Sequence, residues 1–110
     1  MKIGVASTDK VTAQHFGHCD GFDIFESDGE KIISSKFIPN PGHKPGFLPR
    51  FLNEQGVNVI IAGGMGSGAI EIFEENNIKV ITGAQGDPKE NAQAYIEGKL
   101  VSSNTACKGH

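Results

Sequence analysis

The sequence lacks a block of basic residues, a long apolar run and a rich supply of cysteine. Its 110 residues carry 10 Lys and Arg against 13 Asp and Glu, for a formal net charge of −3. Without a basic patch, it lacks the electrostatic footprint of a protein that binds nucleic acid or an anionic membrane. No apolar stretch reaches the roughly 20 residues that a bilayer-spanning helix needs. Residues 1–6 are too short for a signal peptide and fit a strand, so we expect a cytoplasmic protein.

The chain has two cysteines, Cys19 and Cys107, and a reducing compartment argues against a structural disulfide between them. Each cysteine has histidine nearby: His15 and His18 precede Cys19, and His110 follows Cys107. With 37% hydrophobic and 21% charged residues, the chain has enough apolar matter for one core. We therefore expect residues 1–110 to form a single cofactor-binding domain, with a flexible tail from about residue 102.

Hydrophobic periodicity and turn residues predict three strands followed by alternating helices and strands. The first strands are expected at 2–7, 21–26 and 31–38, with a hairpin signal at Asp28-Gly29 between the last two. Helices are expected from about Phe47, after Gly68, and from Pro88, with Asp87 as the cap of the last one. Strands are expected at 57–62 and 78–82. Helical crossovers make the last strands parallel and put helices on both faces. The predicted fold is an α/β three-layer α/β/α sandwich around a mixed five-stranded sheet.

Ligands of such sheets usually bind beyond the carboxyl ends of the parallel strands. Three loops are expected to converge there, at residues 8–20, 63–68 and 83–86.

The first of these loops contains His15-Phe16-Gly17-His18-Cys19. Imidazole and thiolate groups suit zinc, copper, iron or iron–sulfur clusters, so His15, His18 and Cys19 are candidate metal ligands. Each residue alone fits a plainer interpretation, a loop histidine that makes a hydrogen bond or a small buried cysteine. Three donors within five residues favour ligand binding for the cluster as a whole. In the tail, Cys107 and His110 repeat the pairing and are either additional ligands or idle solvated residues.

The second loop is glycine-rich and opens a helix. Glycines let a backbone approach a ligand, and a helix start offers free N–H groups to an anion. A Walker loop is excluded because no Lys-Ser/Thr pair follows the last glycine, and the dinucleotide fingerprint has the wrong spacing. A tight turn that needs glycine for packing is the alternative, although it accounts for only one or two of them. The candidate cofactor-binding residues are Phe16, Gly17, Gly63, Gly64, Met65, Gly66 and Ser67.

Scattered acids, among them Asp9, Asp20 and Asp23, raise the alternative of a metal-dependent hydrolase that acts on a phosphate-bearing substrate. Such an enzyme needs paired carboxylates on central strands, and residues 2–7 contain none. Asp23 and Glu26 fit the polar face of a strand. A small anion-binding regulatory or interaction domain is a further alternative.

The chain resembles the dinitrogenase iron–molybdenum cofactor biosynthesis family, which includes NifX-like carriers, the C-terminal domain of NifB and the molybdenum–copper orange proteins. The resemblance is carried by Met1-Lys2-Ile3 in the first strand, by His15-Phe16-Gly17, by Gly63-Gly64-Met65-Gly66 at a helix start, and by the Cys/His tail. It implies a ribonuclease H-like motif and non-catalytic binding or carriage of an iron–sulfur or molybdenum-containing cluster. It also implies cofactor-assembly proteins as partners, and it transfers to His15, Phe16, Gly17, Gly63, Gly64 and Gly66.

Overall fold

A mixed sheet of six strands forms the centre of the molecule. The computed structural model describes residues 1–41 and 47–100. The order across the sheet is β4-β3-β1-β5-β6, and β2 pairs with β1 outside this path. β1, β5 and β6 are parallel, whereas β3 is antiparallel to both β1 and β4. The strands are β1 (Lys2–Thr8), β2 (Val11–Thr12), β3 (Gly21–Ser27), β4 (Ile32–Pro39), β5 (Val59–Ile61) and β6 (Lys79–Ile81).

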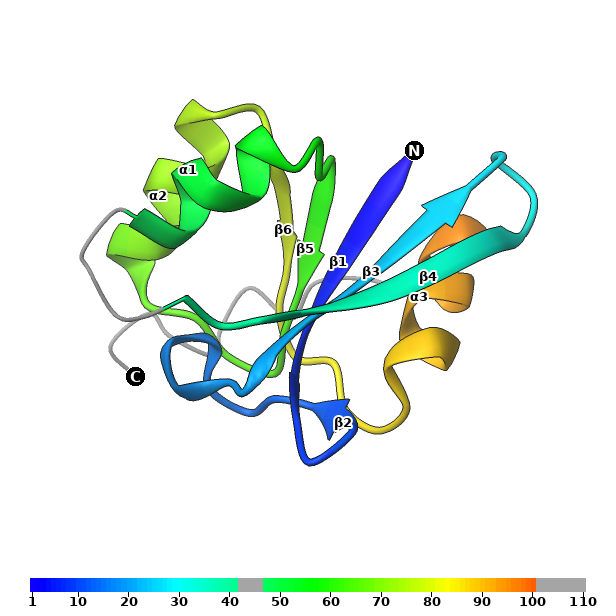
Figure 1. Ribbon diagram of the computed structural model, residues 1–110, viewed down its shortest axis with the longest axis horizontal. Helices are drawn as coiled ribbons and strands as arrows, with labels where there is room; N and C mark the ends of the chain where they lie inside the picture. Colours follow the sequence, from blue (N-terminus) through cyan, green and yellow to red (C-terminus); the bar gives the residue numbers. More distant parts are fainter. Residues whose placement is uncertain (42–46, 101–110) are drawn as a thin grey trace.

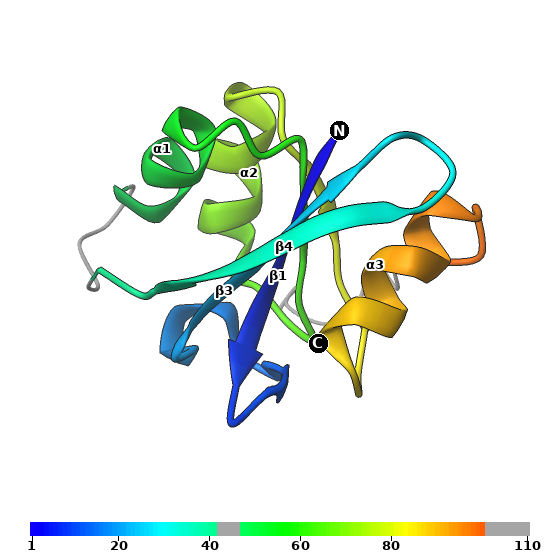
Figure 2. The same cartoon turned by 45° about the vertical axis from the view of Figure 1, so that its right-hand side comes forward.

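Helices cover both faces of this sheet (Figures 1 and 2). On one face lie α1 (Phe47–Glu54) and α2 (Ser67–Glu75), and on the other lies α3 (Pro88–Ile96). Two separate cores follow from this arrangement: Leu52 and Phe73 are buried in the first, and Ala92 is buried in the second. The predicted three-layer α/β architecture is confirmed. None of the helices within residues 1–41 and 47–100 is long and apolar enough to cross a membrane.

The middle strands serve both cores because their side chains alternate between the two faces. In β5, Ile60 faces α1 and α2, whereas Val59 and Ile61 face α3. This arrangement agrees with the continuous apolar run from which a central strand covered on both faces was predicted.

The loop expected at residues 8–20 is more ordered than predicted, and the sheet has six strands rather than five. β2 pairs with the end of β1 through a two-residue turn, in which Asp9 and Lys10 have positive φ angles of 52° and 69°. Two-residue hairpin turns with positive φ usually have the sequence Asn-Gly or Asp-Gly, and here Asp9 is followed by a lysine instead of the glycine. A short 3-10 turn, η1 (Phe16–His18), follows.

Candidate functional site

The loops that follow the three parallel strands meet at one edge of the sheet. The Phe16 amide donates to the Gly64 carbonyl oxygen at 2.9 Å, and the Gly63 amide donates to the Ala13 carbonyl oxygen at 2.7 Å. The third loop joins through the Gly83 amide, which donates to the Gly63 carbonyl oxygen at 2.8 Å. The expected convergence of the segments at 8–20, 63–68 and 83–86 is therefore confirmed by backbone hydrogen bonds.

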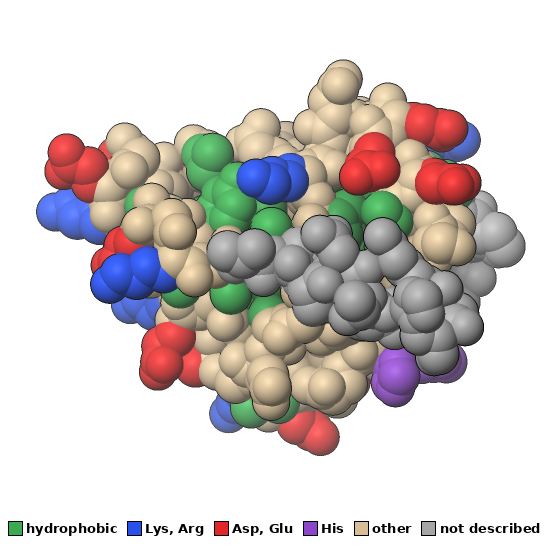
Figure 3. Space-filling view, turned by 180° about the vertical axis from the view of Figure 1, so that it is seen from behind, with side chains coloured by type: hydrophobic (Ala, Val, Ile, Leu, Met, Phe, Trp, Pro, Cys, Tyr) green, Lys and Arg blue, Asp and Glu red, His purple; other side chains and the backbone are tan. Residues whose placement is uncertain are grey.

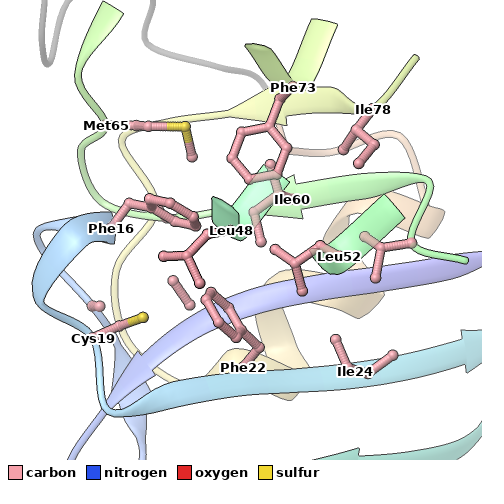
Figure 4. Close-up of a cluster of buried hydrophobic side chains, with 14 residues drawn as sticks. Phe16, Cys19, Phe22, Ile24, Leu48, Leu52, Ile60, Met65, Phe73 and Ile78 are labelled. Atoms are coloured by element: carbon pink, nitrogen blue, oxygen red, sulfur yellow. The ribbon is translucent and has the colours of Figure 1, made fainter. Parts of the chain in front are cut away.

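The turn η1 points Phe16 into the core, and histidines on both sides of Phe16 are exposed. Phe16 is buried, with its ring 5.7 Å from that of Phe22 and 5.3 Å from that of Phe73, measured between centroids. Figure 4 shows Phe16 between Met65 and Phe22 in this cluster. The flanking His15 and His18 are exposed, and their ring centroids lie 6.5 Å apart. Histidine side chains stand out at the molecular surface in Figure 3. Burial of the Phe16 ring thus holds in place the turn that carries these two imidazoles, at the edge where the parallel strands end.

Cys19 belongs to the core rather than to the surface beside these histidines (Figure 4). Its side chain is 5% exposed, and its Sγ accepts a hydrogen bond from Asn40 Nδ2 at 3.7 Å. Burial raises the pKa of the thiol from 9.0 to about 11, although the Asn40 hydrogen bond opposes this effect. At neutral pH the group is a protonated thiol. A ligand role for Cys19 stays a prediction, and it requires a metal to displace the proton and the side chain to reorient.

The glycines of the 63–68 segment have two different environments. A Cβ on Gly63 would lie 2.8 Å from Gln14 Cα and 2.9 Å from the Ala13 carbonyl oxygen, so glycine is needed there for packing. Within the part of the chain that the structure describes, Cβ atoms on Gly66 and Gly68 would meet nothing within 4 Å, and the same holds for Gly17. Neither packing nor a positive φ requires glycine at these three positions. They leave space for a group to approach the backbone.

The remaining residues of this segment divide between core and helix start. Gly64 and Met65 are buried, and Met65 packs in the same core as Phe16. Gly66 is the N-cap of α2, with no side-chain hydrogen bond capping the helix, and Ser67 is its exposed first residue. The first N–H groups of a helix have no partner within the helix, and the positive end of its dipole lies beside them. An anion is the natural ligand for such a helix start.

The described part of the chain does not provide a complete metal site. Within residues 1–41 and 47–100, no group of three or more His, Cys, Asp or Glu side chains is spaced to hold a metal ion. His43, Cys107 and His110 lie outside the described residues. The two exposed imidazoles, His15 and His18, are the donors that the described site offers directly.

Sequence reasoning missed a second group of residues, on the α3 face. Asp9, Asp20 and Asp23 surround a cavity of about 500 Å³. They were interpreted as scattered acids, with Asp23 on the same polar strand face as Glu26. Residues three apart in a strand point to opposite faces, and Asp23 shares its face with Phe25. That alternation was the signal available in the sequence.

Comparisons with known proteins identify the family of this chain and structures that share its fold. A family model described as "Dinitrogenase iron-molybdenum cofactor" matches residues 1–98. The uncharacterized protein MJ0580 of Methanocaldococcus jannaschii is 30% identical over 105 residues, which cover 91% of this chain and 89% of that protein. The crystal structure of PH0822 is 28% identical, covers 96% of both chains and superposes with a TM-score of 0.86. The apo form of the orange protein of Desulfovibrio gigas is 18% identical, with coverage of 93% and 92% and a TM-score of 0.79, and shares the fold.

Proposed function

The chain belongs to the dinitrogenase iron–molybdenum cofactor family, and from this premise we propose that it binds and carries an iron–sulfur or molybdenum-containing cluster without transforming it. The family is one of iron–molybdenum cofactor biosynthesis or binding. The cluster is cargo in this proposal, taken from one cofactor-assembly protein and passed to another. A cytoplasmic location fits this role and stays a prediction.

The observation that carries the proposal is the hydrogen bond from the Phe16 amide to the Gly64 carbonyl oxygen at 2.9 Å. It holds the turn η1 against the glycine-rich segment at the edge where the parallel strands end. Both segments have a glycine, Gly17 and Gly66, at which an added Cβ would contact no atom of the described residues within 4 Å. A bulky inorganic group needs such clearance, because its metal and sulfur atoms must come close to the backbone.

The donor chemistry suits a cluster that carries negative charge. Exposed imidazoles of His15 and His18 are borderline-soft ligands for iron, copper or molybdenum sites. The uncapped start of α2 at Gly66 and Ser67 offers N–H groups to anionic sulfur or oxygen atoms. Phe16 and Met65 are buried, so in this proposal they position the two segments instead of touching the cargo. Cys107 and His110 stay predictions as closing ligands.

The hydrolase alternative receives less support. Asp9, Asp20 and Asp23 do share a cavity, but no metal-holding group of acids or histidines occurs among residues 1–41 and 47–100. Two-metal hydrolysis depends on such a group. We therefore propose a carrier and not an enzyme.

The test is anaerobic reconstitution with iron, sulfide and molybdate, followed by metal and sulfide analysis and an absorption spectrum. The double variant His15→Ala/His18→Ala should lose most of the bound metal, because the site then has no imidazole at its edge. Gly66→Val should also lose it by filling the open space. Gln14→Ala, a change at an exposed neighbour on the same loop, is the matched control. Full metal content in the double variant would remove the ligand role of both histidines.

The same samples distinguish the cluster carrier from the alternative of a small anion-binding regulatory domain, through their melting temperatures. Its sign would be a folded, metal-free protein whose melting temperature is unchanged by every metal or cluster offered, because a ligand that binds the native state must raise that temperature.

A further inference from the structure

The α3 face of the sheet has a cavity that is not part of the proposed cluster site. That site, called the cargo site below, consists of His15, Gly17, His18 and the start of α2 at Gly66 and Ser67. It lies between the start of α3 and the strands β3 and β4, with a volume of about 500 Å³. Phe16 and Met65, which position the segments of the cargo site, pack on the opposite face of the sheet, with α1 and α2. The volume falls within the range of pockets that hold small molecules.

The floor and walls of the cavity are apolar and aromatic. Phe25 is buried, Pro88 is buried at the start of α3, and Phe37 is 50% exposed. Phe37 is held in place by a glycine: a Cβ added to Gly21 would collide with its ring and with the Ile38 carbonyl oxygen. The ring therefore lies across Gly21 and forms a fixed wall, as an aromatic residue does when it covers a glycine on a neighbouring strand. A half-exposed aromatic wall offers contact area to a small apolar or aromatic body.

A single carboxylate stands between these apolar surfaces. Asp23 on β3 is partly buried and lies directly opposite Phe37 on β4 and Val5 on β1. Its Oδ2 accepts a hydrogen bond from Ser7 Oγ at 2.6 Å. No ion pair involving Asp23 occurs in the described part of the chain. A carboxylate has about four acceptor positions, so one hydroxyl donor leaves most of its capacity for a ligand.

The rim of the cavity adds to the negative potential. Four aspartates and two lysines line the cavity. Besides Asp23 they are Asp9, Asp20, Asp87, Lys10 and Lys89. Each of Asp20 and Asp87 has one oxygen that accepts a backbone N–H, from Asp9 and Glu90 respectively. Neither lysine forms an ion pair among residues 1–41 and 47–100. The excess of carboxylates disfavours phosphate and anionic clusters in this cavity, which separates it chemically from the cargo site.

We propose that this cavity binds a small organic cation, with a primary ammonium group on Asp23 and an apolar or aromatic body against Phe37 and Pro88. The ammonium supplies the charged donors that Asp23 lacks, and a charge-assisted hydrogen bond in a partly buried position is stronger than one in water. The Phe37 ring face attracts the same positive charge. The inference is independent of the cluster-carrier proposal, because it uses neither the histidines nor the glycine-rich segment.

The test is an NMR titration of the full-length, isotope-labelled chain with 2-phenylethylamine, 2-phenylethanol and phenylacetate, which share a ring and differ in charge. The protonated amine should bind saturably and about tenfold or more tightly than the alcohol, and phenylacetate more weakly than either. The shifted amides should centre on Asp23, Phe37 and Lys89. Equal affinity for the amine and the alcohol, no saturable binding, or shifts centred on another face would overturn the proposal.

Variants make the test specific to Asp23. Asp23→Asn keeps an oxygen for the Ser7 hydroxyl and should weaken amine binding about tenfold while leaving the alcohol unchanged. Glu71→Gln removes one negative charge from exposed α2 on the other face and should leave amine affinity within twofold. Phe37→Leu, which should weaken the amine and the alcohol together, carries the test if Asp23→Asn does not fold. If Asp23→Asn weakens amine binding no more than Glu71→Gln does, the net charge of the protein accounts for the attraction, and the site is refuted.

Discussion

Glycine has two separable roles at the carboxyl edge of the sheet, and substitution can tell them apart. At Gly63 an added methyl group meets the backbone of Gln14 and Ala13, which cannot move without disturbing the loop junction. At Gly68, in the first turn of α2, the methyl group meets no atom of the described residues, and alanine favours the helix.

We expect Gly63→Ala to lower the free energy of unfolding by about 1–3 kcal/mol through overpacking. Gly68→Ala should raise it by up to about 1 kcal/mol, from helix propensity. Urea unfolding of the metal-free protein measures both. If the carrier proposal holds, Gly68→Ala keeps or gains stability yet binds less cluster. Strong destabilisation by Gly68→Ala would mean that packing, and not ligand approach, explains that glycine.

The raised pKa of Cys19 predicts that the free energy of unfolding falls in alkaline solution. The pKa of its thiol is 9.0 ordinarily and about 11 in the folded protein, because burial disfavours the thiolate. Between pH 9 and pH 11 the unfolded chain has therefore released this proton while the folded chain retains it, so stability falls as the pH rises. The loss should approach about 2 kcal/mol by pH 11.

Comparison with Cys19→Ala isolates this effect from lysine and tyrosine titration. The variant should be less stable at pH 7, since it leaves a small gap in the core, and its stability should decline less between pH 9 and pH 11. Parallel curves for the two proteins would show that the Cys19 thiol ionises normally in the folded state.

At the scale of elements, local chemistry predicted the helix starts well. Asp87 was expected to cap the last helix, and its Oδ2 accepts the Glu90 amide at 3.0 Å with Pro88 in the first turn. The hairpin signal at Asp28-Gly29 was also correct, as Gly29 has a φ of 100° between β3 and β4. These features depend on a few neighbouring residues. The short strand β2 was missed because the turn before it, Asp9-Lys10, lacks the glycine that usually marks a two-residue hairpin. Its distant contacts, from Thr12 to Gly86 and to Asn91 of α3, leave no pattern in the sequence.

Those distant contacts join β2 to α3 through side-chain hydrogen bonds. Thr12 Oγ1 donates to the Gly86 carbonyl oxygen at 2.8 Å and accepts from Asn91 Nδ2 at 2.7 Å. Asn91 Nδ2 also donates to the Gln85 carbonyl oxygen at 3.1 Å. Thr12 and Asn91 are both buried, so each needs the other as a partner.

Thr12→Val should lower the free energy of unfolding by about 1–3 kcal/mol, because it removes the two buried hydrogen bonds of the Thr12 hydroxyl. Asn91 Nδ2 then keeps only the Gln85 carbonyl, and the Gly86 carbonyl keeps only the Thr12 amide. Asn91→Leu should have a similar effect. Measured by urea unfolding, the double variant should fall short of the sum by about 1 kcal/mol. Thr8→Val, at the end of β1, is the control and should stay within about 0.5 kcal/mol of the parent. Additive losses would mean that the Thr12–Asn91 hydrogen bond does not couple β2 to α3.

At the scale of the whole molecule, the parallel crossovers explain why the cargo site was foreseeable and the cavity was not. Crossover connections force the loops after β1, β5 and β6 to one edge, so His15 and Gly64 could be brought together from the sequence alone. The cavity depends on how far α3 extends over β3 and β4, and on the ring of Phe37 lying across Gly21. Hydrophobic periodicity in the sequence does not indicate how far a helix extends over a sheet or where one exposed ring lies.

The two proposed sites use different side chains, and this difference predicts how cluster loading affects stability. A ligand that binds only the folded state at a hundred times its Kd adds about 2.7 kcal/mol, which corresponds to roughly 10 °C in Tm for a chain of this size. Loaded parent protein should show this rise in a thermal melt, and His15→Ala/His18→Ala should not. Asp23→Asn lies on the α3 face and should keep the full rise, because it touches neither the imidazoles nor the start of α2. If Asp23→Asn also abolishes the rise, cluster binding depends on the α3 cavity, and the assignment of the cluster to the imidazoles and the start of α2 alone would be refuted.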